Sequence, residues 1–256
     1  MKKWFLVAAI AATAVSGLAQ AKDWKSVRFA TEGAYPPFNY TNSDGTLGGF
    51  DVDLANAICK EMQAKCQVVP QDWDGIIPAL LARKYDAIIA GMSITEERKK
   101  KVAFTHKYAL IPNKFIAKKG ADIKFTKEGL KGVKIGVQRS TTHDQYIEDN
   151  YKDIVDVVRY GTFDEAYLDL ESGRIDAVFG DASALQSGML DKVEGYEFTG
   201  PSLTDEKWFG DGFGIAVRKQ DQDLADQINK AIDALRAKGI YQQIAAKYFS
   251  YDVYGK

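Results

Sequence analysis

The stretch KYDAIIAGMSITEERK, residues 84–99, is the unit around which the rest of the sequence is organised. Its residues 85–90 form a short apolar run that predicts a buried strand. Gly91 breaks the run, and Ser93 or Thr95 followed by glutamates is typical of a helix N-terminus. The stretch therefore predicts a strand, a turn and a helix in direct succession.

Arg98 lies in the first turn of that predicted helix. A cation there opposes the helix dipole, and the free backbone N–H groups favour anions. An arginine at the end of a strand, beside such groups, is well placed to bind a carboxylate through two hydrogen bonds. The alternative is a solvated Arg98 paired with Glu97, and the spacing alone leaves both interpretations open.

The same unit occurs a second time. Residues 73–87 align with residues 163–177 at a constant offset of 90, and residues 27–29 resemble residues 133–135. This repetition predicts two α/β lobes of similar build. Asp181 follows the strand of the second copy as Gly91 follows that of the first, and it is either a ligand-binding residue or a helix N-cap.

Two further strand ends carry polar residues. A strand over residues 27–31 leads to Glu32, Tyr35 and two prolines, at the place where an open α/β sheet binds its ligand. A strand over residues 131–137 leads to hydroxyl side chains at a helix start, which suits an anion. The alternative for Glu32 is a solvated side chain in a turn. Trp73 is expected either to pack in the core or to form a flat wall over a ligand, and composition favours the core.

A helix is predicted from residue 50, because apolar residues recur on one face at Phe50, Leu54, Ala57, Ile58 and Met62. Asp51 or Asp53 is expected to cap the N-terminus of this helix, and the alternative is that the two aspartates are a pair of metal ligands. Residues 200–212 are rich in glycine and aromatic residues and predict a connection. A strand over residues 213–217 and two final helices follow.

Residues 1–21 have the features of a secretory signal peptide. Two lysines precede an apolar run, and Ala19-Gln20-Ala21 is a small-residue cleavage site. The run is shorter than the roughly 20 residues that a membrane span needs. We expect a mature protein that begins at Lys22, with an uncut membrane anchor as the alternative.

Charge and cysteine content exclude several classes of function. Acidic and basic residues are interspersed, with a formal net charge of −1, so nucleic-acid binding is not expected. Two cysteines in an exported protein favour a disulfide between Cys59 and Cys66 over a metal or redox role. The only histidines, His106 and His143, are too few for a His-rich metal site.

Several short motifs together resemble one family. They are YPPF at 35–38, GFDVDL at 49–54, YDAI at 85–88 with SIT and Arg98, GRIDA at 173–177, and residues 241–249. In this order and spacing, over essentially the whole mature chain, the sequence resembles a periplasmic solute-binding protein of an ABC importer. The family is the polar amino-acid group that includes lysine/arginine/ornithine-, histidine- and arginine-binding proteins.

The resemblance implies an α/β fold of the type II periplasmic-binding-protein class, with two α/β lobes joined by two crossover strands. The implied limits are residues 22–109 plus 213–256 for lobe 1, 114–203 for lobe 2, and 110–113 and 204–212 for the hinge. It also implies a periplasmic monomer that binds its ligand in the cleft, needs neither cofactor nor metal, and delivers its cargo to an ABC permease in the inner membrane.

Carried over position by position, the resemblance implies how an amino acid would be bound. Arg98 would bind the α-carboxylate with help from Ser93 and Thr142. Asp181 would bind the α-ammonium, since a zwitterion needs one fixed cation and one fixed anion. Tyr35 and Trp73 would enclose the ligand's side chain between their rings, and Glu32 would meet its distal cation. The remaining members of the expected site are Ala90, Gly91, Gln138 and His143.

The sequence departs from the family pattern in places that bear on the ligand. Ala90 and Gly91 stand where many relatives have serines, Glu32 replaces a common Asp, and His143 replaces a common Gln. Residues 73–75 also resemble opine-binding relatives. Because Asp181 favours a free α-ammonium, we expect arginine first, then ornithine or lysine, then histidine, and octopine-like opines last. An enzyme alternative is a periplasmic dehydratase with Glu32 and His143 as acid and base.

Overall fold

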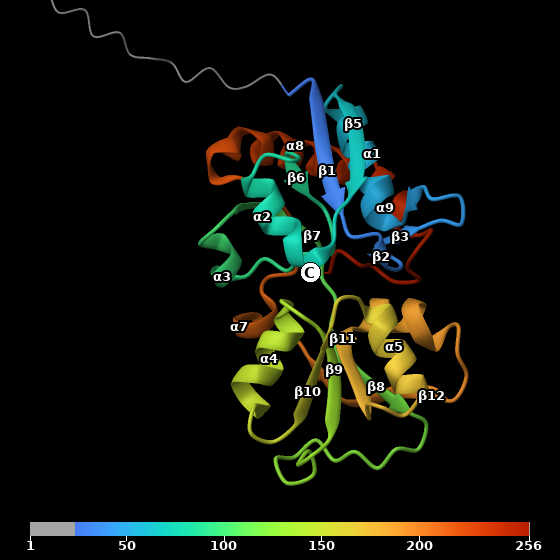
Figure 1. The fold of residues 1–256 in the computed structure, drawn as a ribbon. Coiled ribbons are helices and arrows are strands. Elements are labelled where there is room, and N and C mark those ends of the chain that lie inside the picture. The colour runs from blue at the N-terminus through green and yellow to red at the C-terminus, as the bar shows by residue number, and fades with distance from the viewer. Residues whose placement is uncertain (1–23, 256) are drawn as a thin grey trace, which may run out of the picture.

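The computed structural model describes residues 24–255, which form two α/β units placed one above the other (Figure 1). The predicted signal peptide, residues 1–21, lies outside the described residues. None of the helices within the described range is long and apolar enough to cross a membrane. In that range, no three His, Cys, Asp or Glu side chains are grouped to hold a metal ion.

The first unit is built on a five-stranded sheet with the order β5-β1-β6-β13-β7. β1 is parallel to β5 and β6, whereas β13 is antiparallel to β6 and β7. The strands are β1 (Ser26–Thr31), β5 (Lys65–Pro70), β6 (Ala87–Ile88), β7 (Ala103–Ala109) and β13 (Phe213–Val217). The helices are α1 (Phe50–Glu61), α2 (Ile76–Leu81), α3 (Glu96–Lys99), α8 (Gln222–Ala237) and α9 (Ile240–Ala245), with 3₁₀ turns η1 (Trp73–Gly75) and η3 (Lys219–Asp221).

The second unit repeats this design with the order β10-β9-β11-β8-β12. Its strands are β8 (Asn113–Lys118), β9 (Lys134–Gln138), β10 (Asp156–Tyr160), β11 (Ala177–Asp181) and β12 (Tyr196–Leu203). Its helices are α4 (Thr142–Tyr151), α5 (Phe163–Glu171), α6 (Ala182–Leu185), the π-turn η2 (Gln186–Leu190) and α7 (Glu206–Phe209). A small third sheet joins β2 (Ala34–Tyr35), β3 (Asn39–Thr41) and β4 (Leu47–Gly48).

The internal repeat predicted from the sequence is confirmed at the level of single hydrogen bonds. Phe29 pairs with Ala87 in the first sheet, and the matching residues Ile135 and Ala177 pair in the second. The backbone N–H of Arg28 donates to Asp86 at 3.1 Å, and that of Lys134 donates to Asp176 at 2.8 Å. The apolar run at 85–90 is buried as predicted, although only its residues 87–88 count as a strand.

The chain passes between the two sheets twice, from β7 to β8 and from β12 to β13, which agrees with a two-lobed fold with two crossovers. The exact lobe limits stay a prediction. The connection predicted at 200–212 is wrong for residues 200–203, which continue β12 and pair with β8 through Leu203 and Asn113. The remainder of that connection contains the short helix α7.

Helix α1 packs its predicted face inward, with Phe50, Leu54 and Ile58 fully buried. The expected N-terminal cap is wrong, because the N-cap is Gly49 and no side chain caps the helix. Asp51 turns inward to Asn39 and Tyr108 instead.

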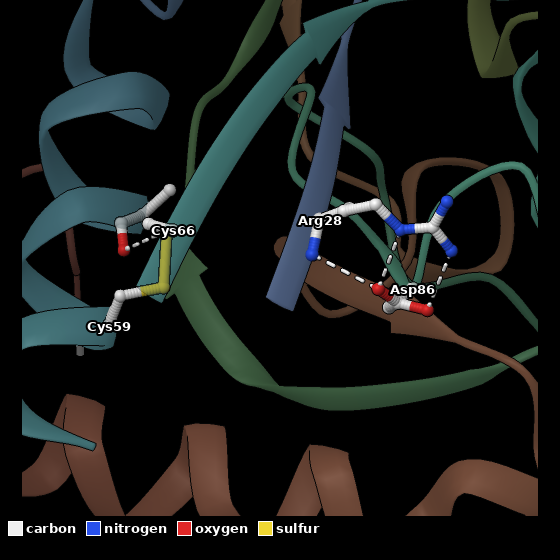
Figure 2. Close-up of a disulfide and its surroundings, with 5 residues drawn as sticks. Arg28, Cys59, Cys66 and Asp86 are labelled. Atoms are coloured by element: carbon white, nitrogen blue, oxygen red, sulfur yellow. Dashed lines mark hydrogen bonds and ion pairs between the residues drawn. A yellow bond between two sulfur atoms is a disulfide. The ribbon is translucent and has the colours of Figure 1, made fainter. Parts of the chain in front are cut away.

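The predicted disulfide is confirmed. Cys59 of α1 is bonded to Cys66 of β5 with a Cα–Cα distance of 5.7 Å, which ties the helix to the edge of the first sheet (Figure 2). Nearby, the Arg28 side chain bonds Asp86 at 3.1 Å. Asp86 also meets the buried Arg218 at 3.3 Å, so one carboxylate joins β1, β6 and the end of β13.

Candidate ligand-binding site between the two sheets

One cavity between the two sheets brings together all eleven residues predicted for ligand binding. About 310 Å³ of space free of protein atoms, part of it open to solvent, lies between its walls. The lining comes from the carboxyl ends of the parallel strands β1, β5, β6, β9, β10 and β11 and from the segments that follow them, where α/β sheets place their ligands. The lining residues are Glu32, Tyr35, Trp73, Ala90, Gly91, Ser93, Arg98, Gln138, Thr141, Thr142, His143, Phe163 and Asp181.

Arg98 supplies the positive charge of the cavity. Thr95 caps helix α3 by accepting the Arg98 backbone N–H at 3.3 Å, and the guanidinium donates to the Ser93 carbonyl at 3.0 Å. Its Cζ lies 5.2 Å from the centre of the Trp73 ring. Burial lowers the pKa of Arg98 to about 10, and the charge of Asp181 opposes that shift. At neutral pH the side chain is therefore still a cation.

The alternative interpretation of Arg98, a solvated side chain paired with Glu97, is wrong. Glu97 accepts from Lys100 at 3.0 Å, on the exposed side of α3. Arg98 is thus available to the cavity.

Asp181 supplies the negative charge. It occupies the N-cap position of α6 but makes no capping hydrogen bond, so the alternative of a simple cap is wrong. It accepts a hydrogen bond from the Tyr35 hydroxyl and lies 3.8 Å from the Nε2 of His143. Burial raises the pKa of Asp181 to about 7, and the Tyr35 hydrogen bond and the Arg98 charge oppose this rise.

Glu32 is a second acidic group at the cavity wall, half-buried rather than solvated as in the alternative. It accepts a hydrogen bond from Gln138 Nε2 at 2.6 Å, and that amide also donates to the Gly161 carbonyl at 2.9 Å. Burial raises the pKa of Glu32 to about 7; the Gln138 hydrogen bond lowers it, and nearby aspartates, Asp164 first, add to the rise. A cation bound beside Glu32 would favour its charged form.

His143 is buried, with 3% of its surface exposed. Its Nε2 lies 2.7 Å from the Asn113 amide oxygen, and its ring meets Phe179 edge-on at 4.9 Å. Burial, together with the charge of Arg98, lowers the pKa of His143 to about 3. The ring is neutral at physiological pH and is a weak base, so it suits a polar contact better than the proton transfer of the dehydratase alternative.

The aromatic walls of the cavity include both expected rings, Tyr35 and Trp73, and a third ring, Phe163. Trp73 is both a core residue and a wall, since it is 9% exposed, packs in an apolar cluster, and donates from Nε1 to the Ser140 carbonyl at 3.3 Å. The Tyr35 ring packs 5.6 Å from Phe163. Gly91, at φ +57°, leaves room for Tyr35, because a Cβ there would lie 3.1 Å from the ring.

Two lining residues were not predicted. Phe163 matches Trp73 at the offset of 90, so the internal repeat could have identified it as a second aromatic wall. Thr141 is the N-cap of α4 and accepts the Asp144 N–H at 3.2 Å. Thr141 belongs to the run of polar residues before Thr142, and the sequence alone does not distinguish a threonine that caps a helix from one that lines a cavity.

A family model described as "Bacterial extracellular solute-binding proteins, family 3" matches residues 27–251. The chain belongs to this family. Relatives that match most of this chain are solute-binding proteins and not enzymes, so the dehydratase alternative is set aside. An L-arginine-binding protein of Pseudomonas aeruginosa is 51% identical over 100% of this chain and 99% of its own length. A lysine/arginine/ornithine-binding periplasmic protein of Escherichia coli is 42% identical over 90% of both chains.

Two solved structures of amino-acid-binding proteins show the same fold. A Salmonella typhimurium periplasmic binding protein, described for its high arginine specificity, has a TM-score of 0.82 and 36% identity, over 88% of this chain and 100% of its own. An ancestral arginine-binding protein bound to arginine also has a TM-score of 0.82, with 40% identity over 88% of this chain and 99% of its own.

Proposed function

We propose that this family 3 protein binds a basic L-amino acid, arginine first, in the cavity between its two sheets and delivers it to an ABC permease. The observation that carries the proposal is the charge pattern of the cavity. Arg98 and Asp181 both line it, yet they form no ion pair with each other within the described residues. A ligand with one carboxylate and one ammonium would satisfy both.

The α-carboxylate would be bound by Arg98, whose guanidinium offers donors in a planar fork. Ser93 and Thr142 line the same cavity, and the start of α4 adds free backbone N–H groups that favour an anion. The α-ammonium would displace the Tyr35 hydroxyl as the partner of Asp181. An ammonium would lower the pKa of Asp181 and keep it charged.

The preference for a basic side chain rests on Glu32 and the aromatic walls. Glu32 is the second carboxylate of the cavity, and a guanidinium or ammonium would replace the Gln138 amide as its partner. Tyr35, Trp73 and Phe163 provide rings on which a planar guanidinium can stack. Arginine fits this set best, followed by ornithine or lysine, then histidine, with octopine-like opines as the alternative.

Location and partners follow the relatives. The Escherichia coli proteins that resemble this chain are named as periplasmic. We expect a periplasmic protein, exported with its predicted signal peptide, that works as a monomer beside an inner-membrane permease. Hinge motion at the two crossovers would open and close the cavity.

The experiment is calorimetry on protein that has been unfolded, dialysed and refolded, which removes bound ligand. Arginine, ornithine, lysine, histidine and octopine are titrated separately. Strong one-to-one binding of arginine with weak binding of octopine supports the proposal. Strong binding of octopine with weak binding of arginine would mean that the ligand is an opine rather than arginine. No binding of any of the five compounds would refute the proposed function.

A further inference from the structure

Asp51 is a fully buried carboxylate that does not line the cavity. It lies in the first turn of α1, yet it makes no contact typical of that position, since the helix is uncapped by side chains. A buried carboxylate is costly unless its oxygens accept hydrogen bonds. The partners of Asp51 therefore indicate what it is for.

Each oxygen of Asp51 accepts from a different neighbour. The Tyr108 hydroxyl donates to Oδ1 at 2.8 Å, and the Asn39 amide donates to Oδ2 at 2.9 Å. Both partners are buried, and both make a second hydrogen bond on their far side. Asp51 is thus the centre of a network with two arms.

The two arms end at the two cavity loops of the first sheet. On one side, the Gly91 N–H donates to the Tyr108 hydroxyl at 3.0 Å. On the other, the Gly33 N–H donates to the Asn39 amide oxygen at 2.8 Å. Gly91 is itself a lining residue, and Gly33 follows the lining residue Glu32.

Both ends of the network hold backbone that other residues rarely adopt. Gly33 has φ +80° and Gly91 has φ +57°. The Tyr35 ring also packs against Gly91, so the distance between the two loops sets where that ring and the Glu32 carboxylate lie. Displacement of either loop would move two groups of the proposed ligand site at once.

We infer that Asp51 is a positioning residue for ligand binding, which holds the loop at Glu32–Tyr35 and the loop at Ala90–Gly91 at one separation through Asn39 and Tyr108. The inference rests on the proposed function. It assigns to a residue outside the cavity a control over affinity.

The test uses a variant that changes the hydrogen-bond pattern with little change in shape. In Asp51→Asn, one acceptor becomes an NH₂ group. If the amide oxygen at position 51 still accepts from the Tyr108 hydroxyl, the NH₂ group at position 51 faces the NH₂ group of Asn39. If the Asn39 amide then flips, its oxygen accepts from the NH₂ group at position 51, but its own NH₂ group faces the Gly33 N–H. One buried donor loses its acceptor in either arrangement. We expect the Kd for arginine, measured by calorimetry on the refolded full chain, to rise about 10-fold.

A second variant restores the pattern. With Asn39→Asp added to Asp51→Asn, the carboxylate at 39 accepts from both Gly33 and the amide at 51, and the amide oxygen at 51 accepts from Tyr108. We expect the Kd to return to within about 3-fold of the wild-type value. Ile228→Val, in the buried face of α8, is the control that lowers Tm without changing the Kd.

Each outcome decides the inference. An unchanged Kd in folded Asp51→Asn overturns it, and so does a double variant that binds as weakly as the single one. Should Asp51→Asn fail to fold, Tyr108→Phe cuts the Gly91 arm alone and must raise the Kd for the inference to stand. Wild-type protein that binds no basic amino acid would instead overturn the proposed function.

Discussion

Replacing Asp181 with asparagine separates charge from shape in the cavity. The side chain is buried, accepts from the Tyr35 hydroxyl, and lies 3.8 Å from His143. An asparagine oxygen can still accept from Tyr35, so the variant keeps its local geometry. What it loses is the negative charge that we propose binds the α-ammonium.

The expected loss of affinity is large. Truncating one partner of a buried, hydrogen-bonded charge pair costs about 2–5 kcal/mol. At about 1.4 kcal/mol for each factor of ten, the Kd for arginine should rise roughly 30-fold to 4,000-fold. The ligand's ammonium would meet a neutral amide, while Arg98 would still bind the carboxylate.

The ligand-free protein should respond in the opposite direction. Burial raises the pKa of Asp181 from 3.8 to about 7, so its charged form destabilises the fold. A raised carboxyl pKa means that stability falls as the pH rises from about 4 through 7. The rise of the Asp181 pKa from 3.8 to about 7 sets an upper limit of about 4 kcal/mol on this loss. Asp181→Asn removes this cost, and ligand-free protein at pH 8 should gain stability, by roughly 2–4 °C in Tm for each kcal/mol.

The assay combines calorimetry with thermal unfolding at pH 8, each with and without arginine. Asp176→Asn is the matched control, because it makes the same chemical change beside the other end of β11, where the carboxylate is exposed and accepts a hydrogen bond from the Lys134 backbone N–H. Its Kd should equal that of the wild type. An Asp181→Asn protein that binds arginine within about threefold of the wild type would refute the assignment of Asp181 to the ammonium.

Three further predictions follow from the same site and fold. Burial raises the pKa values of Asp181 and Glu32 to about 7, so both carboxyl groups should release protons when arginine binds at pH 6, and arginine should bind more tightly at pH 8 than at pH 5. Calorimetry in buffers of different ionisation enthalpy measures the proton release, and an affinity that does not change with pH would contradict the prediction. Glu32→Gln should weaken arginine more than its neutral analogue citrulline, and equal losses for the two ligands would remove Glu32 from side-chain recognition. Replacing Cys59 and Cys66 with serine opens a short loop and should lower the free energy of unfolding by about 2–3 kcal/mol. The Kd for arginine should stay unchanged, because the disulfide lies away from the cavity. A changed Kd would show that α1 transmits strain to the site.

The sequence was sufficient for the fold and for most of the cavity lining. Apolar periodicity and turn residues are local signals, so they located β1, α1 and the strand-turn-helix unit at 84–99. The offset of 90 revealed two lobes of one design, down to the paired Asp86 and Asp176. The carboxyl ends of parallel strands meet at one edge of a sheet, and that rule brought the predicted residues to one cavity.

The pairing of side chains was decided by the tertiary structure alone. Tyr35 meets Asp181 across 146 residues of chain, and Glu32 meets Gln138 across 106. Asp51 stood where a helix cap is expected, but packing turned it toward Asn39 and Tyr108. Local patterns report which face of an element is apolar. Which buried polar group faces which, and how far burial shifts its pKa, depends on segments distant in the sequence that come together only when the chain packs.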